Sequence, residues 1–307
     1  MLSNNNLDNK LLRIESFYHI IDKYDYFVFD CDGVIWTENE ILSSTVKAIQ
    51  KIIEKNKKVF FLSNNNKISR IDFQDKFKSK CGLDISYKFI YNSSFLISKY
   101  ISENYPEIKH VYVIGKSGIE KELEEKGIIV YGGSDNKNIK YIENFSEEDL
   151  DKLEINENIQ ACLCGYDDKF NFFKLTYAMN VINKTGLFFG TNQDRKLKRG
   201  NNFIAGSYTF ISALETCTEK KAQIVTKPDP RSLEIIMSDH NINLKENRER
   251  ILMIGDNLKT DISFANNNNI DSLLVLTGVT REEDLEKLKR DPELNSLFIP
   301  KYVLDYI

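Results

Sequence analysis

Short runs rich in β-branched and aromatic residues alternate, along most of this chain, with segments whose apolar residues recur at helical spacing. Such alternation is typical of an α/β fold with a mainly parallel sheet. We predict strands at 26–29, 59–62, 111–114, 160–164, 223–226, 251–254 and 272–276. Helices are predicted at 44–55, 70–78, 95–103, 120–126, 171–184, 208–216, 230–241 and 259–267.

Several of the predicted strands end in polar residues that could carry chemistry. Asp30 and Asp32 follow the first strand, and Gly33 after them permits a sharp turn. Later strands end in Ser63 with Asn64 and Asn65, in Lys227, and in Gly255 with Asp256 and Asp261. Ligands bind at the carboxyl ends of strands in open α/β sheets, so these ends predict a site. Taken singly, the acidic pair also fits a solvated turn, and the serine and the lysine fit ordinary loops.

In this order, the motifs Asp-x-Asp, Ser, Lys and Gly-Asp-x-x-x-x-Asp resemble those of the haloacid dehalogenase superfamily, specifically its phosphatases. Segments 164–167, 191–194, 203–206 and 275–280 resemble the branch of phosphoglycolate phosphatase and 4-nitrophenylphosphatase. The resemblance covers nearly the whole chain. It implies a Rossmann-like parallel-sheet core domain, residues 1–105 and 206–307, with a mixed α/β cap domain inserted at 106–205.

Two of the acids receive chemical roles from this resemblance. Asp30 would attack phosphorus and form an aspartyl phosphate, which splits one difficult displacement into two easier ones. Asp32 would protonate the leaving alkoxide and then take a proton from the water that hydrolyses the intermediate. Because dehalogenases of the family lack the second acid, its presence favours phosphate as the substrate.

The resemblance also implies a Mg²⁺ site. Its protein ligands would be the carboxylates of Asp30 and Asp256 and the backbone carbonyl of Asp32, since Mg²⁺ prefers hard oxygen ligands and commonly bridges carboxylates to phosphate. Asp261 would orient Lys227 or a metal-bound water from behind this site.

Contacts with the substrate are expected from a further set of residues. Ser63 and Asn64 would donate hydrogen bonds to phosphate oxygens, and Lys227 would stabilise charge on the nucleophile and the phosphoryl group. Gly33 and Asn65 are expected in the same phosphate-binding loops. The partner is thus expected to be a small phosphorylated metabolite.

A run of basic residues at 195–199 follows a segment that resembles a cap loop. By itself this run also fits a solvated basic turn. Arg195 and Arg199 are nevertheless predicted to bind a second negative group of the substrate, such as the carboxylate of phosphoglycolate, because a guanidinium can bind a carboxylate through two parallel hydrogen bonds.

Composition limits the other partners and the compartment. The formal net charge of -4 disfavours nucleic-acid binding, which needs a basic face. The polar N-terminal stretch 1–11 lacks the apolar segment of a secretory signal, and no apolar run is long enough to span a membrane. The five cysteines lack the spacing of a zinc or redox motif and are expected to be reduced thiols. We therefore expect a cytoplasmic protein without membrane contact, and the resemblance implies a possible homodimer through the cap.

The sequence thus predicts a Mg²⁺-dependent phosphatase that hydrolyses small phosphate monoesters such as 2-phosphoglycolate and 4-nitrophenyl phosphate. A pyridoxal phosphate phosphatase of the neighbouring branch is an alternative, and 2-phospholactate is another candidate substrate. A catalytically inactive module that binds phosphorylated ligands is a further alternative, because a fold alone does not establish activity. Retention of Asp30, Asp32, Lys227 and Asp256 argues against an inactive protein.

Overall fold

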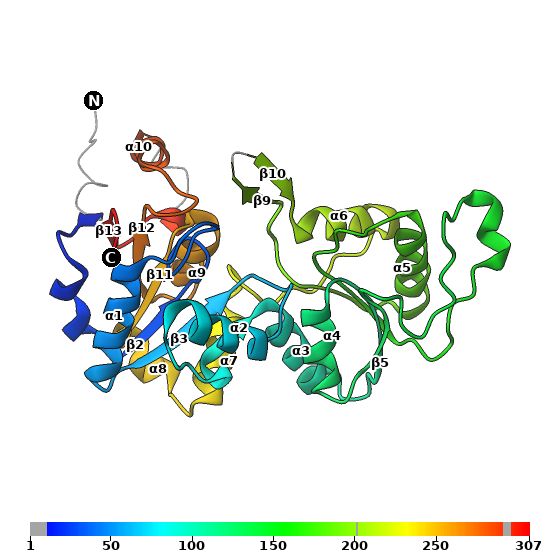
Figure 1. Cartoon of the computed structure of the whole chain (residues 1–307), viewed down its shortest axis with the longest axis horizontal. Helices are drawn as coiled ribbons and strands as arrows, with labels where there is room; N and C mark the ends of the chain where they lie inside the picture. The colour runs from blue at the N-terminus through cyan, green and yellow to red at the C-terminus, as the bar shows by residue number, and fades with distance from the viewer. Residues whose placement is uncertain (1–10, 201, 291–295) are drawn as a thin grey trace. The chain divides into compact units, whose positions relative to one another are not determined.

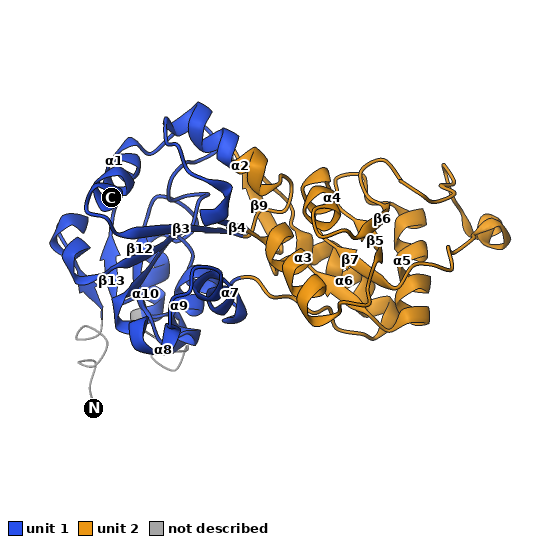
Figure 2. Ribbon diagram, turned by 90° about the horizontal axis from the view of Figure 1, so that it is seen from below, with its two compact units in different colours: residues 1–63, 74–91, 227–307 blue, residues 64–73, 92–226 orange. Residues whose placement is uncertain are grey.

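The computed structural model describes residues 11–200, 202–290 and 296–307, and these divide into two compact units (Figure 2). The first unit comprises residues 1–63, 74–91 and 227–307, and the second comprises residues 64–73 and 92–226. Residues 1–10 of the polar stretch 1–11, from which the absence of a secretory signal was predicted, lie outside the described residues. Within the described ranges, no helix is both long enough and apolar enough to cross a membrane.

A sheet with the strand order β1-β13-β12-β11-β2-β3-β4 forms the centre of the first unit (Figure 1). The strands are β1 (Leu12–Arg13), β2 (Tyr26–Phe29), β3 (Lys58–Ser63), β4 (Ile90–Asn92), β11 (Ile251–Gly255), β12 (Asp271–Val275) and β13 (Tyr302–Leu304). The pairings from β1 through to β3 are parallel. Parallel strands are covered on both faces, which is why β2 and β11 are continuous apolar runs with every residue of β11 buried.

Helical segments connect these strands. They are η1 (Phe17–His19), η2 (Ile21–Lys23), α1 (Ser43–Glu54), α2 (Arg70–Lys76), the π-helix η3 (Phe77–Cys81), η4 (Tyr87–Phe89), α7 (Arg231–Asp239), α8 (Leu244–Asn247), η6 (Arg248–Arg250), the π-helix η7 (Leu258–Ile262), α9 (Ser263–Asn267), α10 (Glu282–Arg290) and η8 (Ser296–Phe298). Helix α1 is amphipathic: Val46, Ile49 and Ile52 recur at helical spacing and all three are buried.

The second unit has a parallel sheet of its own, in the order β6-β5-β7-β8, and an antiparallel hairpin. Its elements are α3 (Ser93–Asn104), β5 (His110–Ile114), α4 (Ser117–Glu124), β6 (Ile129–Gly132), η5 (Glu147–Lys152), β7 (Ala161–Cys164), α5 (Phe172–Thr185), β8 (Phe188–Gly190), the hairpin strands β9 (Lys196–Arg199) and β10 (Asn202–Ala205), and α6 (Ser207–Thr218). Its core packs Tyr112 of β5 against Tyr177 of α5, with ring centroids 4.5 Å apart.

The predicted fold class is confirmed: a parallel-sheet α/β core is accompanied by a second α/β region. Strand 26–29 has the predicted bounds, whereas the strand predicted at 223–226 is wrong. There Gln223 forms an isolated bridge with Phe189, and Thr226 contacts the Thr191 carbonyl through its side-chain hydroxyl, so no strand of several residues forms. The domain bounds 1–105, 106–205 and 206–307 stay a prediction.

Candidate active site

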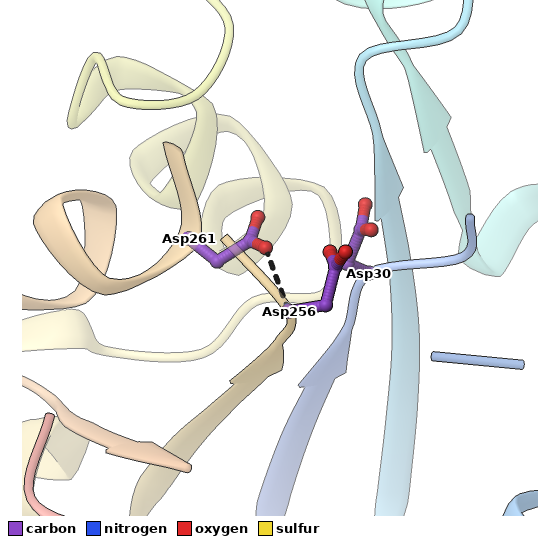
Figure 3. Close-up of side chains that lie close together, drawn as sticks. All are labelled: Asp30, Asp256 and Asp261. Atoms are coloured by element: carbon purple, nitrogen blue, oxygen red, sulfur yellow. Dashed lines mark hydrogen bonds between the residues drawn. The ribbon is translucent and has the colours of Figure 1, made fainter. Parts of the chain in front are cut away.

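Asp30 and Asp256 stand at the carboxyl ends of neighbouring strands. Asp30 follows β2 and Asp256 follows β11, and these two strands pair in parallel with Phe29 beside Ile254. The Asp30 N–H continues the ladder by donating to the Ile254 carbonyl at 2.8 Å. Both side chains are buried. Sheet register therefore brings together two acids that are far apart in the sequence (Figure 3).

Lys227 connects Asp30 with Asp261. Its Nζ lies 2.6 Å from Asp30 Oδ1 and 2.7 Å from Asp261 Oδ1, within donor distance of both carboxylates. The lysine is 1% exposed. Burial lowers the pKa of Lys227, but the two adjacent carboxylates outweigh burial, and the pKa lies above its ordinary value. The ammonium is therefore charged and fixed between two acids.

Asp261 is fixed through both of its carboxylate oxygens. Oδ2 accepts from the backbone N–H of Asp256 at 3.0 Å (Figure 3). Oδ2 also accepts from the backbone N–H of Asn257 at 3.1 Å, and Oδ1 accepts from Lys227. A Cβ added at Gly255 would lie 2.2 Å from the Cβ of Asp261, so only glycine leaves room for this approach. These contacts suit a side chain that orients Lys227 and the Asp256 backbone.

The carboxylates of Asp30, Asp256 and Asp261 form one acidic cluster. Each offers an oxygen, and these oxygens lie within 4.8 Å of one another. Burial raises the pKa of Asp30 to about 8, although Lys227 opposes that rise. Burial, together with the charges of Asp261 and Asp30, raises the pKa of Asp256 well above its usual range. A divalent cation with oxygen ligands fits such a cluster, because it would stabilise the ionised carboxylates that burial disfavours.

Asp32 differs from the other acids in being exposed. Its Oδ1 accepts a hydrogen bond from the Trp36 indole at 2.9 Å, which restrains the side chain at the surface of the first unit. Gly33, with a φ of +90°, makes the turn that follows, and a Cβ there would lie 2.5 Å from Asp256 Oδ2. The turn thus places one acid in the interior and the next at the surface.

The structure places the predicted phosphate-binding residues in different units. Ser63 is buried at the end of β3, the strand beside β2. Asn64 and Asn65 begin the second unit, where Asn64 Nδ2 donates to Asp194 Oδ1 at 3.3 Å and Asn65 Oδ1 accepts from the Lys67 N–H at 2.9 Å. Their contacts with a phosphate group stay predictions.

Arg195 and Arg199 also belong to the second unit. Arg199 ends β9, and Arg195 precedes that strand; both side chains are exposed. The Arg195 carbonyl accepts from the Gly206 N–H at 2.9 Å, which closes the base of the hairpin. The predicted role of these two arginines in substrate binding is untested by these contacts.

Sequence reasoning assigned no role to the loop after β12, although it contacts the acidic cluster. The Val279 N–H donates to Asp256 Oδ2 at 2.6 Å, and the Thr280 N–H donates to the Asp256 carbonyl at 3.0 Å. The sequence did contain a signal for this loop, because the predicted strand 272–276 is followed by the polar residue Thr277 and by Gly278.

Comparison with known proteins decides the family. A sequence-family model of haloacid dehalogenase-like (HAD-like) hydrolases matches residues 27–129, and a second family model, also described as HAD-hydrolase-like, matches residues 224–305. The 4-nitrophenylphosphatase of Schizosaccharomyces pombe is 31% identical over 300 residues, which cover 96% of each chain. The chain belongs to the haloacid dehalogenase-like hydrolases.

Other members of this family support the same branch. The chloroplastic phosphoglycolate phosphatase 1A of Arabidopsis thaliana is 33% identical over 281 residues, 89% of this chain and 74% of that protein. The solved p-nitrophenyl phosphatase from Archaeoglobus fulgidus superposes with a TM-score of 0.75, covering 92% of this chain and 97% of that one at 23% identity, and so shows the shared fold. The predicted phosphatase branch and the enzyme class of phosphoric monoester hydrolase are confirmed.

The different surroundings of Asp261 and Asp32 predict different effects on stability. Asp261→Asn removes a buried charge that faces Lys227, and should lower the free energy of unfolding by about 2 kcal/mol or more. Asp32→Asn, at an exposed position, should change it by less than about 1 kcal/mol. Urea unfolding of both variants with EDTA present measures the difference. Equal losses would contradict the orienting role given to Asp261.

Proposed function

We propose that this chain is a Mg²⁺-dependent phosphatase that hydrolyses small phosphate monoesters through an aspartyl phosphate on Asp30. The observation that carries the proposal is the contact of Lys227 with Asp30, 2.6 Å apart, at the edge of the sheet where Asp256 and Asp261 also lie. The names of the relatives support phosphate esters as the substrate class, with 4-nitrophenyl phosphate and 2-phosphoglycolate as the first candidates.

Asp30 supplies the nucleophile. One carboxylate oxygen attacks phosphorus as the bond from phosphorus to the ester oxygen breaks, and the phosphoryl group is transferred to Asp30. Lys227 holds the attacking side chain through Oδ1 and offsets part of the negative charge that gathers during transfer. Asp261 in turn holds Lys227, so the ammonium is oriented before the substrate arrives.

Asp32 moves the protons. Its protonated carboxyl gives a proton to the leaving alkoxide in the first step, and its carboxylate takes a proton from water in the second. That water attacks phosphorus, the bond to Asp30 breaks, and inorganic phosphate leaves with Asp30 restored as a carboxylate. The exposure of Asp32 fits this role, because the carboxyl group must reach both the leaving group and solvent. The hydrogen bond from the Trp36 indole restrains the side chain in that exposed position.

The residues present fit a divalent cation. Buried carboxylate oxygens lie within 4.8 Å of one another, and Gly33 and Gly278 have no side chain that would displace the Asp256 carboxylate from this position. Asp30, Asp256 and the Asp32 carbonyl would hold the ion. When bound, Mg²⁺ would neutralise the charge of the phosphoryl group and of Asp30.

Substrate choice is assigned to residues outside this cluster. Ser63, Asn64, Asn65 and the turn at Gly33 are the proposed donors to the phosphate oxygens. Arg195 and Arg199 are proposed to favour a substrate with a second negative group. Pyridoxal 5′-phosphate is the alternative substrate, and the homodimer and the cytoplasmic location stay predictions.

Separate roles for Asp30 and Asp32 predict separable kinetic defects. Asp30→Asn should abolish turnover of 2-phosphoglycolate and of 4-nitrophenyl phosphate, since no nucleophile remains. Asp32→Asn should still accept a phosphoryl group from 4-nitrophenyl phosphate, whose leaving group needs little protonation. Rapid-quench mass spectrometry with each substrate detects the phosphorylated protein.

Two results would contradict this mechanism. An Asp30→Asn variant with near-normal kcat would exclude Asp30 as the nucleophile. A wild-type protein that binds phosphorylated ligands in Mg²⁺ but turns none of them over would favour the inactive module. Including pyridoxal 5′-phosphate in the same assay, and comparing kcat/KM, ranks the substrate alternatives.

The metal requirement gives a second prediction. EDTA should abolish activity and Mg²⁺ should restore it, whereas Ca²⁺ should not, because the larger ion takes more ligands in a looser geometry. Asp256→Ala should reproduce the effect of EDTA at ordinary Mg²⁺ concentrations. Steady-state assays over a Mg²⁺ titration test both statements, and full activity of Asp256→Ala would show that the ligand is misassigned.

A further inference from the structure

The loop that follows β12 links the two segments that carry the acids. The Thr277 hydroxyl donates a hydrogen bond to the backbone carbonyl of Gly33, at the end of the turn that contains Asp30 and Asp32. Strand β12 pairs with β11 and not with β2, so this bond reaches across the end of β11. Asp256 lies at that end, directly after Gly255.

Asp256 is enclosed by the segments that this bond joins. Its Oδ2 accepts from the Val279 N–H at 2.6 Å. A Cβ on Gly278 would lie 1.8 Å from the same oxygen, and one on Gly33 would lie 2.5 Å from it. The carboxylate is therefore held between two glycine backbones, and its position depends on how closely those backbones approach each other.

The other carboxylate oxygen of Asp256 is available to a ligand. Among the described residues, no donor makes a hydrogen bond to Oδ1. The loop after β12 therefore occupies one oxygen with a backbone N–H and leaves the second for a cation. The hydrogen bond from the Thr277 hydroxyl to the Gly33 carbonyl connects this loop with the turn that contains Asp30 and Asp32.

We propose that Thr277 is a positioning residue for the metal site: through Gly33 it sets the separation between the carboxylates of Asp30 and Asp256, and thereby the affinity for the divalent cation. This inference rests on the cation site of the proposed function. Partners that orient metal ligands without touching the metal typically change affinity by about 10-fold to 100-fold when they are removed.

Thr277→Val and Thr277→Ser form a matched pair of variants. Valine keeps the shape of threonine and removes the hydroxyl, whereas serine keeps the hydroxyl. Mg²⁺ affinity is measured by calorimetry without substrate, and independently as the Mg²⁺ concentration that gives half of the maximal rise in Tm. Thr277→Val should bind Mg²⁺ about 10-fold more weakly, and Thr277→Ser should stay within about 2-fold of the wild type.

Gly278→Ala disturbs the Asp256 carboxylate directly, without changing Thr277. It therefore tests the inference even if the valine variant fails to fold. It leaves the Thr277 hydroxyl in place and adds a Cβ against Asp256 Oδ2. It should also weaken Mg²⁺ binding. Circular dichroism and the Tm measured in EDTA establish that each variant is folded.

The possible outcomes separate this inference from the proposed function. If the wild type binds Mg²⁺ and Thr277→Val binds it with the same affinity, the positioning role is overturned and the proposed function is left intact. Equal weakening in the valine and serine variants would also overturn it, because the hydroxyl would then be irrelevant. Normal Mg²⁺ affinity in Gly278→Ala would show that Asp256 does not depend on this loop. A wild type that binds no Mg²⁺ would overturn both the inference and the proposed function.

Discussion

One ammonium group, that of Lys227, lies between two buried carboxylates, 2.6 Å from Asp30 and 2.7 Å from Asp261. Burying acids this close together is costly unless each is paired and hydrogen-bonded. Lys227 offsets part of that cost, but a single positive charge cannot balance three carboxylates, and the pKa values of Asp30 and Asp256 are raised. Additional positive charge would therefore stabilise the ionised cluster, and a divalent cation supplies such charge.

Backbone geometry determines how closely the acids can approach. Asp30 and Asp256 follow paired strands, so the parallel register places the two residues side by side at the edge of the sheet. Glycines then remove the atoms that would keep the segments apart, because a Cβ at Gly255 would meet Asp261 and one at Gly33 or Gly278 would meet Asp256. The carboxylates carry the chemistry of the site, and the strand register together with these glycines allows the carboxylates to lie close together.

The sequence predicted the elements whose signal is local. Strand β2 was found to the residue, because an apolar run ends abruptly at Asp30. The contact between Asp261 and Lys227 was one of two partners foreseen for Asp261, and the structure shows it. Side-chain type at a strand end was enough to find these groups, since the carboxyl ends of neighbouring parallel strands lie at one edge of a sheet.

Features that depend on partners elsewhere in the chain escaped prediction. Segment 223–226 contains the apolar pair Ile224 and Val225 and was assigned as a strand, but the structure has an isolated bridge between Gln223 and Phe189 in place of a strand. The hairpin of β9 and β10 was missed because its residues are mostly charged or exposed and give no apolar alternation. Val279 contacts Asp256 through a backbone N–H, which every residue except proline has, so its identity carries no signal.

A double-mutant cycle between Lys227 and Asp261 tests the central claim, that their mutual contact holds the acidic cluster together. The free energies of unfolding in urea with EDTA are measured for the wild type, Lys227→Met, Asp261→Asn and the double variant. The account predicts that each single change is costly and that the double variant loses less than the sum, with a coupling energy of at least about 1 kcal/mol. Additive losses, with a coupling energy near zero, would show that the two groups act independently and would contradict the account.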